Sequence, residues 1–183
     1  MNNQGRRAQT TSLSEDVSRR RVVLVGLVGW IATLGVDLFL NAGVFAWVFF
    51  EPSPFLLPPE ELFVRIPLGY LSFLLITGLV VWLMSSRLII GWRAGARFGV
   101  LLGAVIHGAG VLGMASVSTA PVSLLAAWFV GQTLQTGVVG AVVGQGFATS
   151  NLRRLGLLVV VLDIVLIGTT FALQYLALVP TNP

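Results

Sequence analysis

Five long apolar stretches dominate the sequence, and each is long enough for a helix to cross the hydrocarbon core of a bilayer, which takes about 20 residues. Charged residues make up 10% of the 183 residues and hydrophobic residues 56%, whereas a soluble domain carries roughly 25% charged residues. We therefore predict an all-α integral membrane protein, a bundle of five transmembrane helices. The predicted spans are residues 22–50, 62–84, 95–117, 122–147 and 155–178.

The segments between the spans are short, so we expect one compact bundle. Ser12 and Glu15 have the spacing of a capping box, which predicts a helix start at Ser12. The second span has few polar residues, and we expect it to be the most lipid-exposed helix, outside a polar interior that the other four surround. The expected regions are a polar, arginine-rich N-terminal tail (1–21), the five-helix transmembrane domain (22–179) and a C-terminal tail (180–183).

All eleven basic residues are arginine, and all of them except Arg65 lie on one side of the predicted bundle. Because cytoplasmic loops are enriched in basic residues, we predict a cytoplasmic N-terminus, a C-terminus outside, and a multi-pass location in the cell (inner) membrane. This pattern favours membrane orientation over nucleic-acid binding as the reason for the net charge of +4. The arginines expected to contact anionic lipid headgroups are Arg87, Arg93, Arg97, Arg153 and Arg154.

Small residues recur at every fourth position in the third and fourth spans. Gly99 and Gly103 are followed by His107 at the same spacing, and Gly140 and Gly144 repeat the spacing in the fourth span. Residues four apart share one face of a helix, and small side chains let two backbones approach closely in lipid. We therefore predict that these four glycines pack helices together.

Polar residues inside the spans form a second pattern. His107, Gln132 and Asp163 come from three spans at comparable depth, near the middle of the bilayer. Asp37 and Asn41 lie four residues apart and add a polar face in the outer half of the first span. A carboxylate inside a membrane costs about 2.5–3.5 kcal/mol, which makes it a functional candidate. We predict an intramembrane cluster of these five residues as a candidate proton or ion site.

The same residues also have structural interpretations. Glutamines can hydrogen-bond between helices, and His107 is expected to bond an aspartate rather than to ligate a metal or haem. One histidine is too few for a bis-histidine haem within a single chain. The sequence has no cysteine, which excludes disulfides and thiolate metal sites. We predict no metal and no cofactor, with haem or a pigment kept as an alternative.

The chain combines few reactive groups with many packing faces. It contains no lysine, no HExxH motif and no paired histidines, which excludes lysine chemistry and this class of metal hydrolase. We therefore expect a non-enzymatic structural or accessory subunit of a homo-oligomer or membrane complex. A small transporter, channel or proton-conducting unit built on the polar cluster is the first alternative, and a lipid- or pigment-associated protein is the second. Basic residues that are all arginine are typical of a GC-rich bacterial genome.

Overall fold

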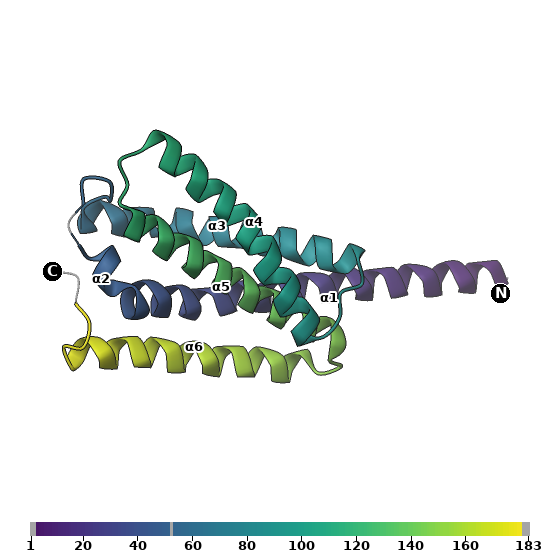
Figure 1. Ribbon diagram of the computed structural model, residues 1–183. Coiled ribbons are helices and arrows are strands. Elements are labelled where there is room, and N and C mark those ends of the chain that lie inside the picture. The colour runs from purple at the N-terminus through teal and green to yellow at the C-terminus, as the bar shows by residue number, and fades with distance from the viewer. Residues whose placement is uncertain (1–2, 52, 181–183) are drawn as a thin grey trace.

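The computed structural model describes residues 3–51 and 53–180, and all regular structure within them is helical (Figure 1). Five of the helices are long and apolar enough to cross a membrane: α1 together with η1, α3, α4, α5 and α6. The predicted all-α class and the count of five candidate spans are thereby confirmed. In chain order the elements are α1 (Asn3–Phe39), the π-helix η1 (Leu40–Val44), α2 (Ala46–Phe49), α3 (Pro59–Ser86), α4 (Trp92–Val117), α5 (Val122–Ala148) and α6 (Leu152–Tyr175).

The first helix differs from the prediction at both ends. It begins at Asn3 rather than Ser12, and its α-helical part ends at Phe39 instead of continuing to residue 50. A π-helix follows, in which each turn is wider by one residue, and π-helical turns inside α-helices occur frequently at functional sites. The widened turn has a partner from another helix, because Gln174 Nε2 donates to Ala42 O at 3.2 Å.

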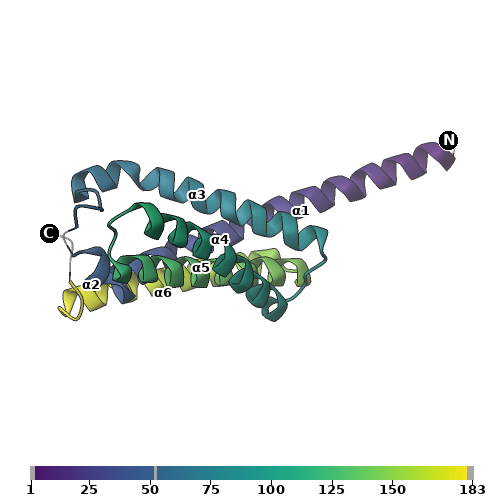
Figure 2. The same ribbon diagram turned by 45° about the horizontal axis from the view of Figure 1, so that its top comes forward.

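Helix α5 lies at the centre of the bundle and packs against α1, α3 and α4. Helix α4 packs mainly on α5, and α6 packs mainly on α1. In both views the first turns of α1 project beyond the other helices (Figures 1 and 2). The main core lies between α1, α3 and α5 and consists of Val25, Val80, Val81, Met84, Val139 and Val143.

Helix α3 is largely exposed, as are α4 and α6, but the prediction that the second span would lie outside the bundle is wrong. In the most hydrophobic stretch of α4, 6% of the residues are buried, and in the corresponding stretch of α3 the share is 17%. Helix α3 turns Thr77, Val80 and Met84 into the bundle, each with an exposed fraction of 1% or less. Helix α4 instead touches α5 through one narrow face. The second span is therefore part of the packed bundle, and the third lies at its edge.

Arg21 ties the start of the first candidate span to the end of α5. Its Nη2 group donates to Gly146 O at 3.0 Å and also to Thr149 O. The last carbonyls of a helix lack partners within it and carry the negative end of its dipole, so a guanidinium there supplies both donors and charge. Nearby, Gly91 at the start of α4 donates its N–H to Gly144 O at 2.8 Å. These contacts gather the arginine-bearing helix ends at one end of the bundle.

Candidate functional site

The α4–α5 seam, where α4 from Gly91 to His107 lies on α5, is lined by glycines of both helices. A Cβ atom placed on Gly140 would lie 3.0 Å from Gly99 Cα, and one placed on Gly144 would lie 2.5 Å from Gly91 O. A side chain at either position would therefore push the helices apart. This close approach of the two backbones brings His107 within reach of α5.

His107 lies one turn beyond Gly103 on the same face of α4. A Cβ atom on Gly103 would be 2.9 Å from Thr136 Cβ, and His107 Nε2 lies 3.1 Å from Thr136 Oγ1. The Thr136 hydroxyl can donate its one proton to Gln132 O at 2.8 Å, and the imidazole Nε2–H is the donor to Thr136 when it does so. The Thr136 hydroxyl thus contacts the His107 ring and the backbone carbonyl of Gln132, and the Gln132 side chain takes no part in either contact.

Asp163 lies in a different part of the bundle, and Thr136 takes the place of the aspartate that was predicted as the partner of His107. Asp163 packs on α1, where a Cβ atom on Gly35 would lie 2.7 Å from Asp163 Cα. Thr33, two residues before Gly35, faces α5, and residues two apart point about 200° from each other around a helix. Helix α1 therefore separates Asp163 from the His107 group.

The α1–α6 seam, where Asp163, Thr170 and Gln174 of α6 lie on α1 and η1, contains polar side chains. Asp163 is 7% exposed, and its Oδ1 atom has no hydrogen-bond partner within the described part of the chain. About two turns further along α6, a Cβ atom on Gly43 would lie 3.6 Å from Thr170 Oγ1, and Gln174 bonds the Ala42 carbonyl. In this seam the two backbones therefore approach closely at one point, and polar side chains of α6 contact the first helix further along.

Asp37 and Asn41 form a third group. Asn41 Nδ2 donates to Asp37 Oδ1 at 2.9 Å, a contact within the continuous helix formed by α1 and η1. Both side chains are half-buried. The five residues of the predicted cluster are thus divided among three places: His107 and Gln132 on either side of Thr136, Asp163 in the α1–α6 seam, and the hydrogen-bonded Asp37 and Asn41.

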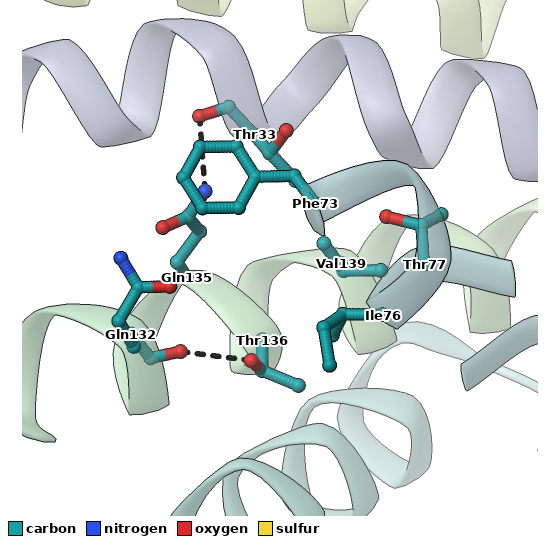
Figure 3. Close-up of a pocket in the computed structure, with 8 residues that line it drawn as sticks. All are labelled: Thr33, Phe73, Ile76, Thr77, Gln132, Gln135, Thr136 and Val139. Atoms are coloured by element: carbon teal, nitrogen blue, oxygen red, sulfur yellow. Dashed lines mark hydrogen bonds between the residues drawn. The ribbon is translucent and has the colours of Figure 1, made fainter. Parts of the chain in front are cut away.

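A small cavity lies between α1, α3 and α5, beside the His107 group (Figure 3). It has a volume of about 10 Å³. Gln135 reaches across it, and its Nε2 atom donates to Thr33 O at 3.4 Å. Two of the lining residues each have a buried oxygen, Thr77 Oγ1 and Gln135 Oε1, without a protein partner among the described residues. The lining residues are Thr33, Phe73, Ile76, Thr77, Gln132, Gln135, Thr136 and Val139.

Four of the five polar lining residues are absent from the predicted cluster: Thr33, Thr77, Gln135 and Thr136. Thr136 has a signal in the sequence, because it stands four residues after Gln132 and four before Gly140, in the row of small and polar residues. Thr77 has none of comparable strength. It shares a helix face with Val80, but α3 is apolar on all sides, so hydrophobic periodicity does not distinguish the buried face from the lipid-facing one.

The arginines predicted to meet lipid headgroups are exposed and lie at the end of the bundle where α3 ends and α4 and α6 begin. Arg93 also places its guanidinium carbon 5.1 Å from the centre of the Trp92 ring. The one ion pair in the described part of the chain lies elsewhere, between Arg65 and Glu61 at 3.9 Å. The basic end therefore presents positive charge that no carboxylate of the described residues neutralises. The residues concerned are Arg87, Arg93, Arg97, Arg153 and Arg154.

Within residues 3–51 and 53–180, no group of three or more histidine, cysteine or acidic side chains is placed to hold a metal ion. Comparison of the chain with protein-family models, curated proteins and solved structures finds no match. The geometry of this chain is therefore the ground for inferring its function.

Proposed function

We propose that this chain is a multi-pass protein of the cell (inner) membrane and a non-enzymatic structural or accessory subunit of a homo-oligomer or larger membrane complex. Five candidate spans support membrane insertion, and the uneven distribution of arginine supports a cytoplasmic N-terminus and a C-terminus outside. The exposed arginines at the predicted cytoplasmic end would contact anionic headgroups. The proposal includes no cofactor and no nucleic acid.

The observation that carries the subunit role is an open face on the second half of α4. Ala109, Gly113 and Ser116 share one helix face, are exposed, and lie opposite the face that carries His107. A Cβ atom on Gly113 would meet nothing within 4 Å, and Ser116 Oγ donates to Gly113 O at 2.7 Å, which leaves the surface smooth. The first half of the same helix uses such a face to bind α5. A second small-residue face with room beside it suits another helix.

Disulfide crosslinking tests this role, because the chain contains no cysteine of its own. We expect Gly113→Cys to give a covalent dimer in native membranes under mild oxidation, or a crosslink to a co-purifying protein. The matched control is Leu71→Cys on α3, which is 51% exposed and shares its helix face with Leu68, Leu74 and Leu75 instead of small residues. A monomer in gentle detergent, with no crosslink and no co-purifying protein, would rule the subunit role out.

Reporter fusions test the orientation separately. A reporter that works only in the cytoplasm should be active at the N-terminus and inactive at the C-terminus, and a reporter that works only outside should show the reverse. Both ends on the same side would contradict five spans. A reversed result would contradict the positive-inside assignment while leaving the bundle unchanged.

Proton or ion conduction is a second candidate, and the cavity beside the His107–Thr136 contact favours it. Buried polar groups at membrane depth commonly mark proton or ion pathways. If the chain conducts, His107→Ala should lose flux in proteoliposomes, whereas Thr169→Val, an exposed change on α6, should keep it. Wild-type flux in both His107→Ala and Asp163→Asn would exclude a pathway through either group.

A further inference from the structure

The α3–α4 turn (residues 87–91) exposes apolar side chains at the basic end of the bundle (Figure 1). Leu88 is 79% exposed and Ile90 is 54% exposed, and Trp92, the first residue of α4, is 55% exposed. The α5–α6 turn at the same end has the polar sequence Thr-Ser-Asn at residues 149–151. Serine and asparagine are typical of turns that face water, so the apolar α3–α4 turn suits a different environment.

The backbone of the α3–α4 turn is fixed to the bundle in a conformation that leucine rarely adopts. Leu88 has a φ angle of 52°, in the left-handed region, where glycine is the usual residue at the end of a helix. On either side the chain is held: Ile89 N–H donates to Met84 O at 3.0 Å, and Gly91 N–H donates to Gly144 O. Ile89 also packs on the main core. Strained residues of this kind cluster at functional sites, and here the strain accompanies an outward-facing leucine.

Two arginines flank the exposed apolar side chains. Arg87 follows the last residue of α3, Arg93 follows Trp92, and both are exposed. The guanidinium of Arg93 lies over the Trp92 ring, so a charged group and an aromatic group are adjacent on this surface. Neither arginine forms an ion pair within the described part of the chain. Tryptophan is enriched where acyl chains meet headgroups, and basic groups beside apolar ones favour binding to anionic lipid.

We propose that the α3–α4 turn binds an anionic phospholipid of the cytoplasmic leaflet. Leu88, Ile90 and Trp92 enter the boundary between headgroups and acyl chains, and Arg87 and Arg93 contact the lipid phosphate. A zwitterionic lipid offers the same acyl chains, but its cationic group opposes the attraction of the arginines. The inference rests on the proposed membrane location and orientation, and it adds a defined lipid contact to the general attraction of arginines for headgroups.

Fluorescence quenching by brominated lipid tests the site, because the chain has no cysteine and a single thiol-attached probe can be introduced. Full-length Leu88→Cys is labelled and reconstituted in vesicles of phosphatidylcholine and phosphatidylglycerol, with bromine on the acyl chains of one lipid or the other. We expect strong quenching, with phosphatidylglycerol favoured about fivefold for each arginine in contact. Adding Arg87→Gln and Arg93→Gln should remove the preference and keep the quenching. Ile90→Cys is a second labelling position and should give the same result.

Two control positions separate this inference from the membrane location on which it rests. Leu75→Cys lies midway along the candidate span of α3, is 68% exposed, and should be quenched equally by both lipids. Ser150→Cys in the polar α5–α6 turn should be quenched only weakly. An unquenched probe at position 75 would contradict the membrane location itself. If the probe at 75 is quenched, a probe at 88 that neither lipid quenches, or that both quench equally, would overturn the lipid site alone.

Discussion

The α4–α5 seam and the α1–α6 seam join helices in two different ways. In the first, glycines succeed one another every fourth residue, and backbone meets backbone over several turns. In the second, the backbones approach closely near Gly35 and Asp163, and Thr170 and Gln174 extend the contact with polar groups. Lipid removes the hydrophobic drive between helices, so both seams depend on shape and hydrogen bonds. The comparison teaches that one chain can hold one pair of helices together mainly by close backbone packing and another pair with a larger share of polar contacts.

This difference has a consequence for tolerance to mutation. A carbonyl oxygen opposite a glycine belongs to a rigid helix and cannot move aside, whereas the end of a side chain can rotate away. The α4–α5 seam should therefore be the more sensitive to added volume. The α1–α6 seam should be the more sensitive to loss of polar groups.

The largest effect is expected from Gly95→Ala in the α4–α5 seam. A Cβ atom at this position would overlap the Gly140 carbonyl, and overpacking typically costs 1–3 kcal/mol. We expect a loss of about 3 kcal/mol, the upper end of that range, although alanine is the better helix former. Unfolding in mixed micelles measures the loss. Gly78→Ala on α3 is the control, since a Cβ atom there meets nothing within 4 Å, and it should keep or slightly raise stability.

Gly35→Ala in the α1–α6 seam should cost less, about 1–2 kcal/mol. The added methyl group would lie 2.5 Å from Asp163 Oδ1, which can rotate, and 2.7 Å from Asp163 Cα, which cannot. Gly26→Ala on the same helix is the control, because its methyl group would meet Val81 Cγ2 at an ordinary 3.5 Å. The same unfolding assay applies. A loss at Gly35 as large as the loss at Gly95 would remove the distinction between the seams.

A double-mutant cycle of His107→Ala and Thr136→Val measures the polar contact that accompanies the glycine seam. Hydrogen bonds between membrane helices average about 0.6 kcal/mol, with a maximum near 1.7 kcal/mol. The contact at 3.1 Å should give a coupling energy within that range. Unfolding of the wild type, both single variants and the double variant provides it. Additive losses would mean that His107 and Thr136 are neighbours without a stabilising bond.

The sequence was sufficient for the features that depend on local pattern. Composition and the length of the apolar stretches predict five candidate spans, and the four-residue spacing of glycine predicts a smooth face on α4 and on α5. These properties follow from neighbours along one helix. They do not require knowledge of which helix lies opposite.

Helix neighbours could not be predicted in the same way. Depth placed His107 and Asp163 at the same level, but depth carries no information about position around the bundle, and the two lie on either side of α1. Thr77 was unrecognised for a related reason, because a helix that is apolar on every side has no contrast between lipid and core. Such residues become visible only when the packing of the other helices is known.

Gln174→Leu should produce the smallest change inside a seam and sets the scale for single polar contacts between α1 and α6. The substitution removes the bond to Ala42 O while keeping the side chain large, so we expect a loss of about 0.6 kcal/mol.

Arg65→Gln is the reference variant outside both seams. Its ion pair with Glu61 is 59% exposed on each side, and such helix pairs contribute about 0.3–0.5 kcal/mol that salt diminishes. Unfolding at low and high salt separates the two contacts, because only the Arg65 effect should shrink. If the Gln174 effect shrinks equally, it arises from an interaction between charges, and the neutral bond to Ala42 O is not its source.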